Sequence, residues 1–173
     1  MELLKGQKIL LGITGGIAAY KTPHLVRAIK KMGGDVRVVI SENGLNFVSK
    51  TVLEELSGHP VALSTFPEKN EDYHISFKDY ADLFVIAPAT YNIIGKIASG
   101  IADDLITTTA SLLIGKKIPV LVFPSMNNYM FDNPILKKNL SNLKELNIRV
   151  IPPDSGWLAC NEEGQGRMPE PED

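Results

Sequence analysis

Two segments of the chain share one layout, in which an apolar run is followed by a proline and then by small polar side chains. Leu83–Ala87 precedes Pro88-Ala89-Thr90-Tyr91-Asn92, and Pro119–Phe123 precedes Pro124-Ser125-Met126-Asn127-Asn128. A hydroxyl or amide placed directly after a strand is suited to hydrogen-bond a ligand, and it is equally suited to cap the helix that follows. The pattern by itself leaves ligand contact and helix capping as even alternatives.

A third polar segment, Thr14-Gly15-Gly16, follows the apolar run that begins at Lys8. Backbone N–H groups at such a turn, directly before a helix, can hold a phosphate. The glycines do not have the G-x-G-x-x-G or Walker spacing, so a tight turn that needs small residues for packing is the alternative. Ser41 comes directly after the run Val36–Ile40, at the position where dinucleotide-binding proteins usually present an acid to the ribose.

The three histidines and the single cysteine lie in different settings. His24 falls within a predicted helix, His59 lies in a Gly-His-Pro turn with no evident partner, and His74 lies in a polar stretch before the third apolar run. Their spacing to Cys160 is not that of metal ligands, so no metal site is expected. Cys160 belongs to a Gly- and Pro-rich stretch that reads either as a flap over a site or as a disordered tail.

Composition excludes several classes of protein. The chain has 173 residues, a formal charge of −2 and 44% hydrophobic residues, which argues against a disordered chain and against a polybasic nucleic-acid binder. One cysteine cannot form an internal disulfide, and no apolar run approaches the ~18 residues of a membrane span. The N-terminus lacks the features of a signal peptide. We therefore expect a cytoplasmic protein without membrane or nucleic-acid partners.

The elements that must position the polar segments alternate along the chain. Apolar runs predict strands over 8–14, 36–40, 83–87, 119–123 and 148–151, and helical spacing predicts helices over 17–32, 45–56, 92–99, 102–113 and 134–146. This alternation predicts an α/β fold, a three-layer αβα Rossmann-like or flavodoxin-like open parallel sheet. We expect one domain over 1–173, with 152–173 as an irregular flap. In such a sheet the polar segments would meet at the carboxyl ends of the strands, where ligands bind.

Taken together, these segments resemble the flavin-containing cysteine decarboxylases, from Lys8 to Pro171. The resemblance rests on four motifs in the family's order. They are His74-Ile75-Ser76, Pro88–Ile93 with Gly100–Leu105, Pro124–Phe131, and a substrate clamp comprising Leu158-Ala159-Cys160 and Gly166–Pro171. Two positions depart from the family pattern, because Tyr91 replaces an alanine and Phe131 a tryptophan.

The resemblance implies the cofactor and the role of each matching residue. FMN would be bound by Gly15, Gly16, Ser41, Ala89, Thr90 and Asn92. The catalytic residues would be His74 as base, Asn127 as ligand of the substrate carboxylate and amide, and Cys160 as proton donor. The substrate would contact Asn127, Met130, Ala159, Arg167 and Met168.

The branch of the family that this chain resembles most decarboxylates 4'-phosphopantothenoylcysteine to 4'-phosphopantetheine in coenzyme A biosynthesis. In the family reaction the flavin oxidises the thiol to a thioaldehyde, whose C=S group is the electron sink that an acylated amine cannot supply. CO2 is then lost and the flavin reduces the enethiol. Family members form trimers with FMN at the subunit interface, sometimes assembled into dodecamers. Many are fused to a phosphopantothenate–cysteine ligase.

Four other interpretations compete with this one. A peptidyl-cysteine decarboxylase would share the Asn127 motif but have a different clamp, and a flavin prenyltransferase would lack both. A non-catalytic binding or regulatory module of the same fold would carry long acidic extensions and often lose the catalytic residues. A nicotinamide dehydrogenase remains possible from the fold alone, although the G-x-G-x-x-G motif is missing.

Overall fold

A five-stranded parallel sheet forms the centre of the computed structural model, which describes residues 2–64, 73–157, 159 and 163–172. The strand order is β2-β1-β3-β4-β5, and every neighbouring pair is parallel. The strands are β1 (Lys8–Ile13), β2 (Asp35–Ile40), β3 (Leu83–Ala89), β4 (Val120–Pro124) and β5 (Arg149–Val150). The predicted α/β fold with an open parallel sheet is confirmed.

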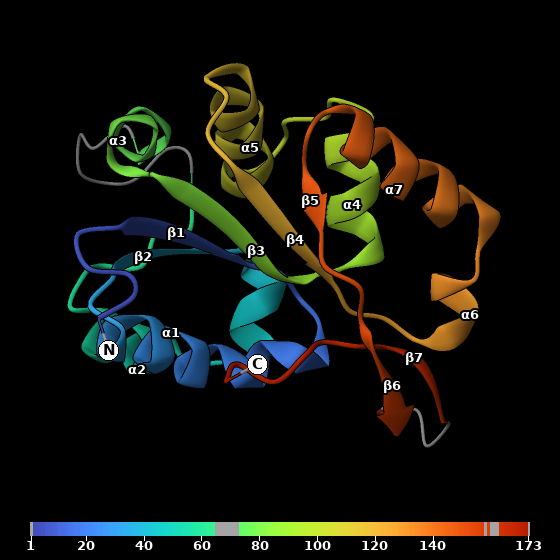
Figure 1. Cartoon of the computed structure of the whole chain (residues 1–173), viewed down its shortest axis with the longest axis horizontal. Helices are drawn as coiled ribbons and strands as arrows, with labels where there is room; N and C mark the ends of the chain where they lie inside the picture. The colour runs from blue at the N-terminus through green and yellow to red at the C-terminus, as the bar shows by residue number, and fades with distance from the viewer. Residues whose placement is uncertain (1, 65–72, 158, 160–162, 173) are drawn as a thin grey trace.

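Helices cover both faces of the sheet and make three layers (Figure 1). One face carries η1 (Ile17–Lys21), α1 (Thr22–Lys31) and α2 (Lys50–Ser57), and the short η2 (Glu42–Asn46) follows β2. The other face carries α3 (Tyr73–Tyr80), α4 (Tyr91–Ala98), α5 (Leu105–Gly115) and α7 (Pro134–Glu145).

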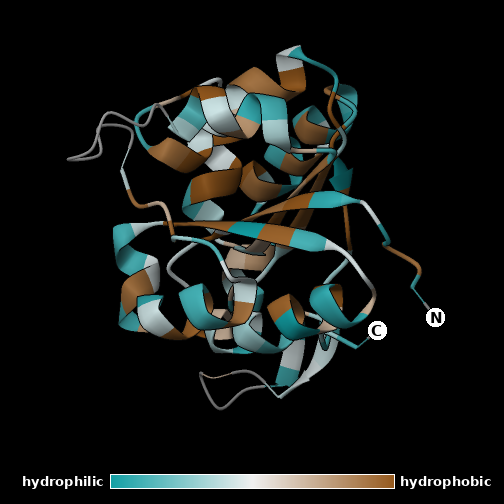
Figure 2. Cartoon of the chain, turned by 90° about the vertical axis from the view of Figure 1, so that its left-hand side faces the viewer, coloured by the Kyte–Doolittle hydropathy of each residue, from teal (hydrophilic) through white to brown (hydrophobic). Residues whose placement is uncertain are grey.

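Both faces of the strands are buried, which explains why the strands read as continuous apolar runs. Successive strand side chains point to opposite faces. Leu10 accordingly belongs to the core under α3 and α5, whereas Ile9 and Leu11 belong to the core under α1 and α2. Figure 2 shows hydrophobic strands between helices whose hydrophilic sides face outward. Within the described residues, no helix is both long and apolar enough to cross a membrane.

The helix boundaries differ from the predicted ones for local reasons. The helix expected over 17–32 is divided into a 3-10 turn, η1, and a regular helix, α1, in which Pro23 occupies the first turn. Proline lacks an N–H and fits best at a helix start, so the regular helix begins there. The helix expected from residue 102 begins only at Leu105, because Asp104 and Thr107 form a capping box.

Three elements were not expected from the sequence. The stretch around His74 is helical in α3, a short helix α6 (Asn128–Phe131) follows β4, and the segment expected to be irregular contains an antiparallel ribbon. The ribbon pairs β6 (Asp154–Trp157) with β7 (Glu163–Arg167). Its strands are polar and rich in glycine, so they lack the apolar alternation that identifies a strand in sequence.

Candidate active site

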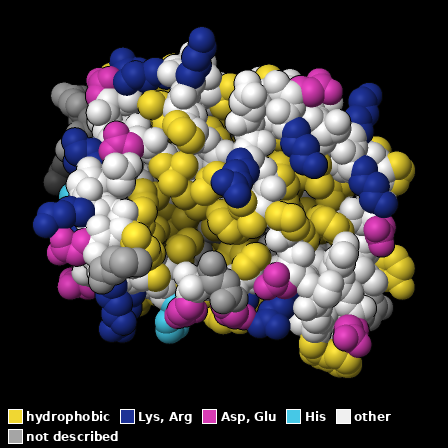
Figure 3. All heavy atoms as spheres, in the orientation of Figure 1, with side chains coloured by type: hydrophobic (Ala, Val, Ile, Leu, Met, Phe, Trp, Pro, Cys, Tyr) yellow, Lys and Arg dark blue, Asp and Glu magenta, His cyan; other side chains and the backbone are white. Residues whose placement is uncertain are grey.

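A cleft of about 1100 Å³ opens at the carboxyl edge of the sheet. The polar segments that follow β1, β2, β3 and β4 all line it, as the parallel arrangement predicts. Figure 3 shows hydrophobic side chains gathered in and around a hollow on the face seen in Figure 1. The apolar wall of the cleft includes Ile17, Ala18, Ile40, Leu63, Ile93, Leu105, Ile106, Met126 and Met130.

The two glycines of the turn after β1 differ in their surroundings: Gly15 packs against the loop after β2, and Gly16 faces the cleft. A Cβ on Gly15 would lie 2.4 Å from Asn43 Cβ and 3.0 Å from Asn43 C, so only glycine fits against the loop after β2. A Cβ on Gly16 would meet Thr90 Cγ2 at 3.4 Å, an ordinary contact. The Gly16 N–H donates to the Thr14 carbonyl at 2.9 Å and is therefore used within the turn. Any phosphate here must use other donors.

Three side chains at the cleft cap helices, and capping leaves their hydrogen-bond donors for a ligand. Ser41 Oγ accepts from Gly44 N (3.2 Å), Thr90 Oγ1 from Ile93 N (3.5 Å) and Asn127 Oδ1 from Met130 N (2.8 Å). A capping hydroxyl keeps its O–H, and a capping asparagine keeps both hydrogens of Nδ2. Ligand contact and capping are therefore compatible, although the sequence presented them as alternatives.

The ends of β1 and β3 are joined by a buried hydroxyl. Thr14 Oγ1 donates to the Pro88 carbonyl at 2.6 Å and accepts from Thr90 N at 3.1 Å. The side chain of Thr14 thus holds the glycine turn beside the start of α4. Both bonds bridge residues more than seventy positions apart in sequence.

We expect Thr14→Val to lower the free energy of unfolding by about 2 kcal/mol, because valine fills the space but leaves the Pro88 carbonyl and the Thr90 N–H without partners. Urea denaturation would measure the change. Thr51→Val on the exposed side of α2 is the matched control and should stay within about 0.5 kcal/mol of the wild type. Equal stability of the two variants would contradict the bridging role of Thr14.

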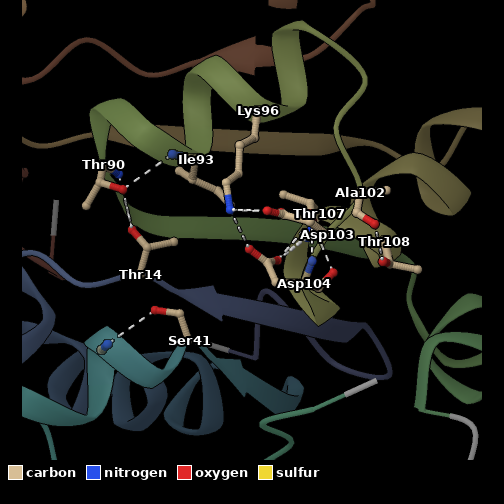
Figure 4. A network of polar contacts seen from close by, with 11 residues as sticks. Thr14, Ser41, Thr90, Ile93, Lys96, Ala102, Asp103, Asp104, Thr107 and Thr108 are labelled. Carbon is tan, nitrogen blue, oxygen red and sulfur yellow. Dashed lines mark hydrogen bonds and ion pairs between the residues drawn. The ribbon is translucent and has the colours of Figure 1, made fainter. Parts of the chain in front are cut away.

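A second polar network lies at the opening between α4 and α5 (Figure 4). Lys96 Nζ lies 2.8 Å from Asp103 Oδ1 and 3.5 Å from Asp104 Oδ2. The hydrogen bond that Lys96 donates to Asp103 raises the pKa of Lys96 and lowers the pKa of Asp103. Sequence reasoning did not select these three cleft residues. The signal was available in the Gly100–Leu105 motif, which places two acids directly before a helix.

The ribbon closes one side of the cleft and is fastened to the loop after β4. Met126 N donates to the Gly166 carbonyl at 3.1 Å. A Cβ on Gly166, whose φ is +132°, would lie 2.0 Å from Met126 O. Only glycine permits this approach. The ribbon thereby brings Trp157, Ala159, Arg167 and Met168 to the cleft.

The structure brings most of the expected site residues together. The following residues all line the cleft: Gly15, Gly16, Ser41, Thr90, Asn92, Asn127, Met130, Ala159, Arg167 and Met168. Ala89 is fully buried in β3 behind the lining rather than in it. His74 is not among the lining residues of its own chain, and Cys160 lies outside the described residues.

The three histidines occupy distinct places. His24 is exposed on α1. His59, expected to have no partner, instead contacts Asp35, with 2.8 Å between Nε2 and Oδ1. His74 is the second residue of α3, and its Nδ1 is buried without a hydrogen-bond partner in the described part of the chain.

The end of α3 shows where His74 lies relative to the cleft. Asp82, just after α3, donates its N–H to the carbonyl of Lys8 at the amino end of β1. Eight helical residues span about 12 Å. His74 therefore lies within about one length of α3 from the amino edge of the sheet, and it is outside the cleft lining of its own chain.

The residues fit a flat, largely apolar ligand that carries an anionic group. The cleft volume slightly exceeds the ~300–1000 Å³ of typical small-molecule sites. It therefore has room for a cofactor together with a substrate. Hydroxyl donors at Ser41 and Thr90 suit a phosphate, and the apolar wall suits a ring system. Fold and site together define an α/β protein that binds a nucleotide-like ligand at the carboxyl edge of its sheet.

Comparison with known proteins gives the family. The Flavoprotein family model matches residues 2–173, and the chain belongs to this family. It is 42% identical over 172 residues to the coenzyme A biosynthesis bifunctional protein CoaBC of Bacillus subtilis, covering 98% of this chain and 42% of that protein. The CoaBC protein of Escherichia coli K12 is 41% identical over 170 residues, covering 97% and 41% respectively. The chain thus spans about two fifths of the length of these relatives.

Solved structures agree with this membership. A Cys-to-Ser mutant of PPC decarboxylase complexed with pantothenoylaminoethenethiol superposes with a TM-score of 0.84 at 33% identity, covering 95% of this chain and 92% of that one. The FMN-binding protein AtHal3 gives 0.81 at 33% identity, covering 96% and 91%. The FMN-dependent cysteine decarboxylase SpaF gives 0.77 at 27% identity, covering 93% and 90%.

Proposed function

We propose that this chain is an FMN-dependent decarboxylase that converts 4'-phosphopantothenoylcysteine to 4'-phosphopantetheine in coenzyme A biosynthesis. The observation that carries the proposal is the position of Asn127, which lines the cleft directly after Met126, the residue that binds the ribbon at Gly166. Membership of the Flavoprotein family and the names of the similar proteins support it. Residues 1–173 would form one catalytic domain in a cytoplasmic enzyme, with 152–173 as its substrate clamp.

Asn127 is the group best placed to hold the substrate carboxylate. Its Oδ1 is fixed by the Met130 N–H, so the amide orientation is set by the helix cap. Nδ2 then has two hydrogens to donate toward a carboxylate or an amide oxygen. Met130, Ala159, Arg167 and Met168 line the same cleft and complete the proposed substrate contacts.

FMN, when bound, supplies the two-electron oxidation of the thiol-bearing carbon and the later reduction that together leave no net redox change. Gly15, Gly16, Ser41, Thr90 and Asn92 would hold it against the apolar wall, with Ala89 packed behind them. His74 would take a proton as base, and Cys160 would return one to the decarboxylated product. A lining of hydrophobic side chains limits water around these proton transfers.

We further propose that the enzyme is a homo-oligomer, a trimer or an assembly of trimers, in which His74 reaches the cleft of a neighbouring subunit. Two observations support this. His74 is outside the cleft of its own chain, and several large apolar side chains around the cleft are exposed, among them Ile17, Tyr20 and Trp157. Such patches are typical of protein interfaces. Coupling to a phosphopantothenate–cysteine ligase would match the bifunctional relatives.

The test is an anaerobic incubation of the purified protein with 4'-phosphopantothenoylcysteine, with the product mass and the flavin absorbance followed together. We expect a yellow protein that releases CO2 and forms 4'-phosphopantetheine. A yellow protein that acts only on a peptide with a C-terminal cysteine would transfer the function to the peptide branch of the family. A colourless protein inactive on both would favour a binding or regulatory module.

If Cys160 is the proton donor, its replacement should block the final reduction of the enethiol without blocking the release of CO2. We expect Cys160→Ser to release CO2 while the oxidised enethiol product accumulates, because a serine hydroxyl is a far weaker acid than a thiol. Mass spectrometry would distinguish the enethiol from 4'-phosphopantetheine by two hydrogens. Normal amounts of 4'-phosphopantetheine from this variant would remove Cys160 from the mechanism.

A further inference from the structure

Lys21, at the end of η1, is a charged side chain that is only 5% exposed. Its Nζ donates to the carbonyl of Met168 and to Glu170 Oε1, both at 2.8 Å. Met168 is itself 3% exposed and belongs to the core under α1 and α2. The lysine thus connects the first helical turn of the chain to the segment that follows β7.

The environment of Lys21 makes these contacts energetically important. A buried ammonium requires hydrogen-bond and charge partners, and those described for Lys21 both come from residues 168–170. The hydrogen bond from Lys21 lowers the pKa of Glu170, so the carboxylate is charged at neutral pH. Arg167 also donates to Glu170 and connects this pair to the end of β7.

The contact with Lys21 makes the segment after β7 span the cleft. Strand β7 is fastened at two places: Gly166 binds Met126 after β4, and the residues following β7 bind Lys21 after β1. Strand β3 lies between β1 and β4 in the sheet. The chain from Gly166 to Glu170 therefore crosses from one side of the cleft to the other, past the proposed substrate contacts Arg167 and Met168.

We propose that Lys21 is a positioning residue for the substrate clamp: its buried ammonium anchors Met168–Glu170 and so holds the end of β7 across the cleft. This proposal rests on the proposed function, because it assigns a cause for the placement of the clamp. Lys21 acts through Arg167 and Met168. The contact with Lys21 restricts the movement of the clamp before the substrate binds, so substrate binding does not have to supply that ordering free energy.

The first experiment is hydrogen exchange of the FMN-loaded full chain, read on the peptide covering residues 163–172. Lys21→Met keeps the length of the side chain and removes the charge. We expect exchange in this peptide to rise by about tenfold or more, as for the loss of a charge-assisted hydrogen bond, with exchange in β1 unchanged. Lys31→Met, at an exposed position in α1, is the matched control and should leave the peptide as in the wild type.

A kinetic readout separates positioning from a catalytic role. We expect Lys21→Met to raise KM for the substrate by about tenfold while kcat changes much less, since only the uniform binding of substrate is weakened. Flavin content should remain that of the wild type. Loss of flavin with an unchanged clamp peptide would overturn the proposal and place Lys21 in the cofactor site.

A second variant keeps the proposal testable if Lys21→Met does not fold. Glu170→Gln retains Lys21 but removes the charge of its partner, and it should also accelerate exchange in residues 163–172. In the double variant the two effects should not add, because both act on one contact. Exchange equal to the wild type in Glu170→Gln would refute the anchor. Because exchange is read without substrate, an inactive wild-type enzyme would contradict the proposed function while leaving this result interpretable.

Discussion

Replacing His74 with asparagine is expected to lower the rate of CO2 release by about 10²–10⁴-fold, the usual contribution of a positioned general base. Asparagine retains much of the shape of the imidazole but does not accept a proton near neutral pH. Flavin binding should persist, because the residues proposed to hold FMN come from other segments of the chain and are unchanged. The measurement is single-turnover CO2 release from FMN-loaded protein. His24→Asn, at an exposed position in α1, is the control.

Mixing His74→Asn chains with chains of a second variant tests whether the active site is shared between subunits. If His74 serves the cleft of a neighbour, His74→Asn and Asn127→Asp chains mixed by unfolding and refolding should form some sites with both native residues. Activity should then reappear, although each variant alone is nearly inactive. Full activity of His74→Asn would contradict the assignment of the base. An inactive mixture, at a subunit exchange verified by mass spectrometry, would contradict the shared site.

Replacing Gly15 with alanine is expected to weaken flavin binding strongly. The added Cβ would lie 2.4 Å from Asn43 Cβ and close to the Asn43 backbone, so the turn after β1 or the loop after β2 must move. Both segments line the cleft, and the displacement would separate the Ser41 and Thr90 hydroxyls. We expect at least about a hundredfold weaker FMN affinity, equivalent to nearly 3 kcal/mol. Flavin fluorescence titration of the apoprotein would measure it.

Gly115→Ala provides the control for this substitution, because a Cβ there meets nothing within 4 Å and lies at the end of α5, remote from the lining residues. Its flavin affinity should match that of the wild type. If Gly15→Ala also binds FMN normally while remaining folded, the turn does not position the cofactor, and the role of Gly15 would be restricted to packing.

The elements of the core were predictable because their signals are local. Strand β1 and strand β3 are apolar on both faces, and this pattern requires no knowledge of neighbours. The turns at Gly33 and Gly58 have an equally local signal, because glycine is the preferred residue just after a helix, and both residues have positive φ there. The polar residues after each strand could therefore be assigned to one edge before any contact was known.

The helix around His74 and the β6–β7 ribbon were not predictable in the same way. Helix α3 has only eight residues, and the ribbon is polar with glycines at 156, 164 and 166. The ribbon is held by tertiary contacts, such as Met126 with Gly166, rather than by its own apolar face. Its strands therefore leave no periodic pattern in the sequence.

By itself, the sequence determined the alternation of the five sheet strands with helices, the parallel sheet and the group of motifs that resemble a flavin-containing decarboxylase. Only the tertiary structure decided which polar residues converge on the cleft and which do not. It joined Thr14 to Thr90, and Lys21 to Glu170, and it left His74 outside the cleft of its own chain. The physical reason is that helix and strand patterns arise from neighbouring residues, whereas these contacts join residues 76 and 149 positions apart.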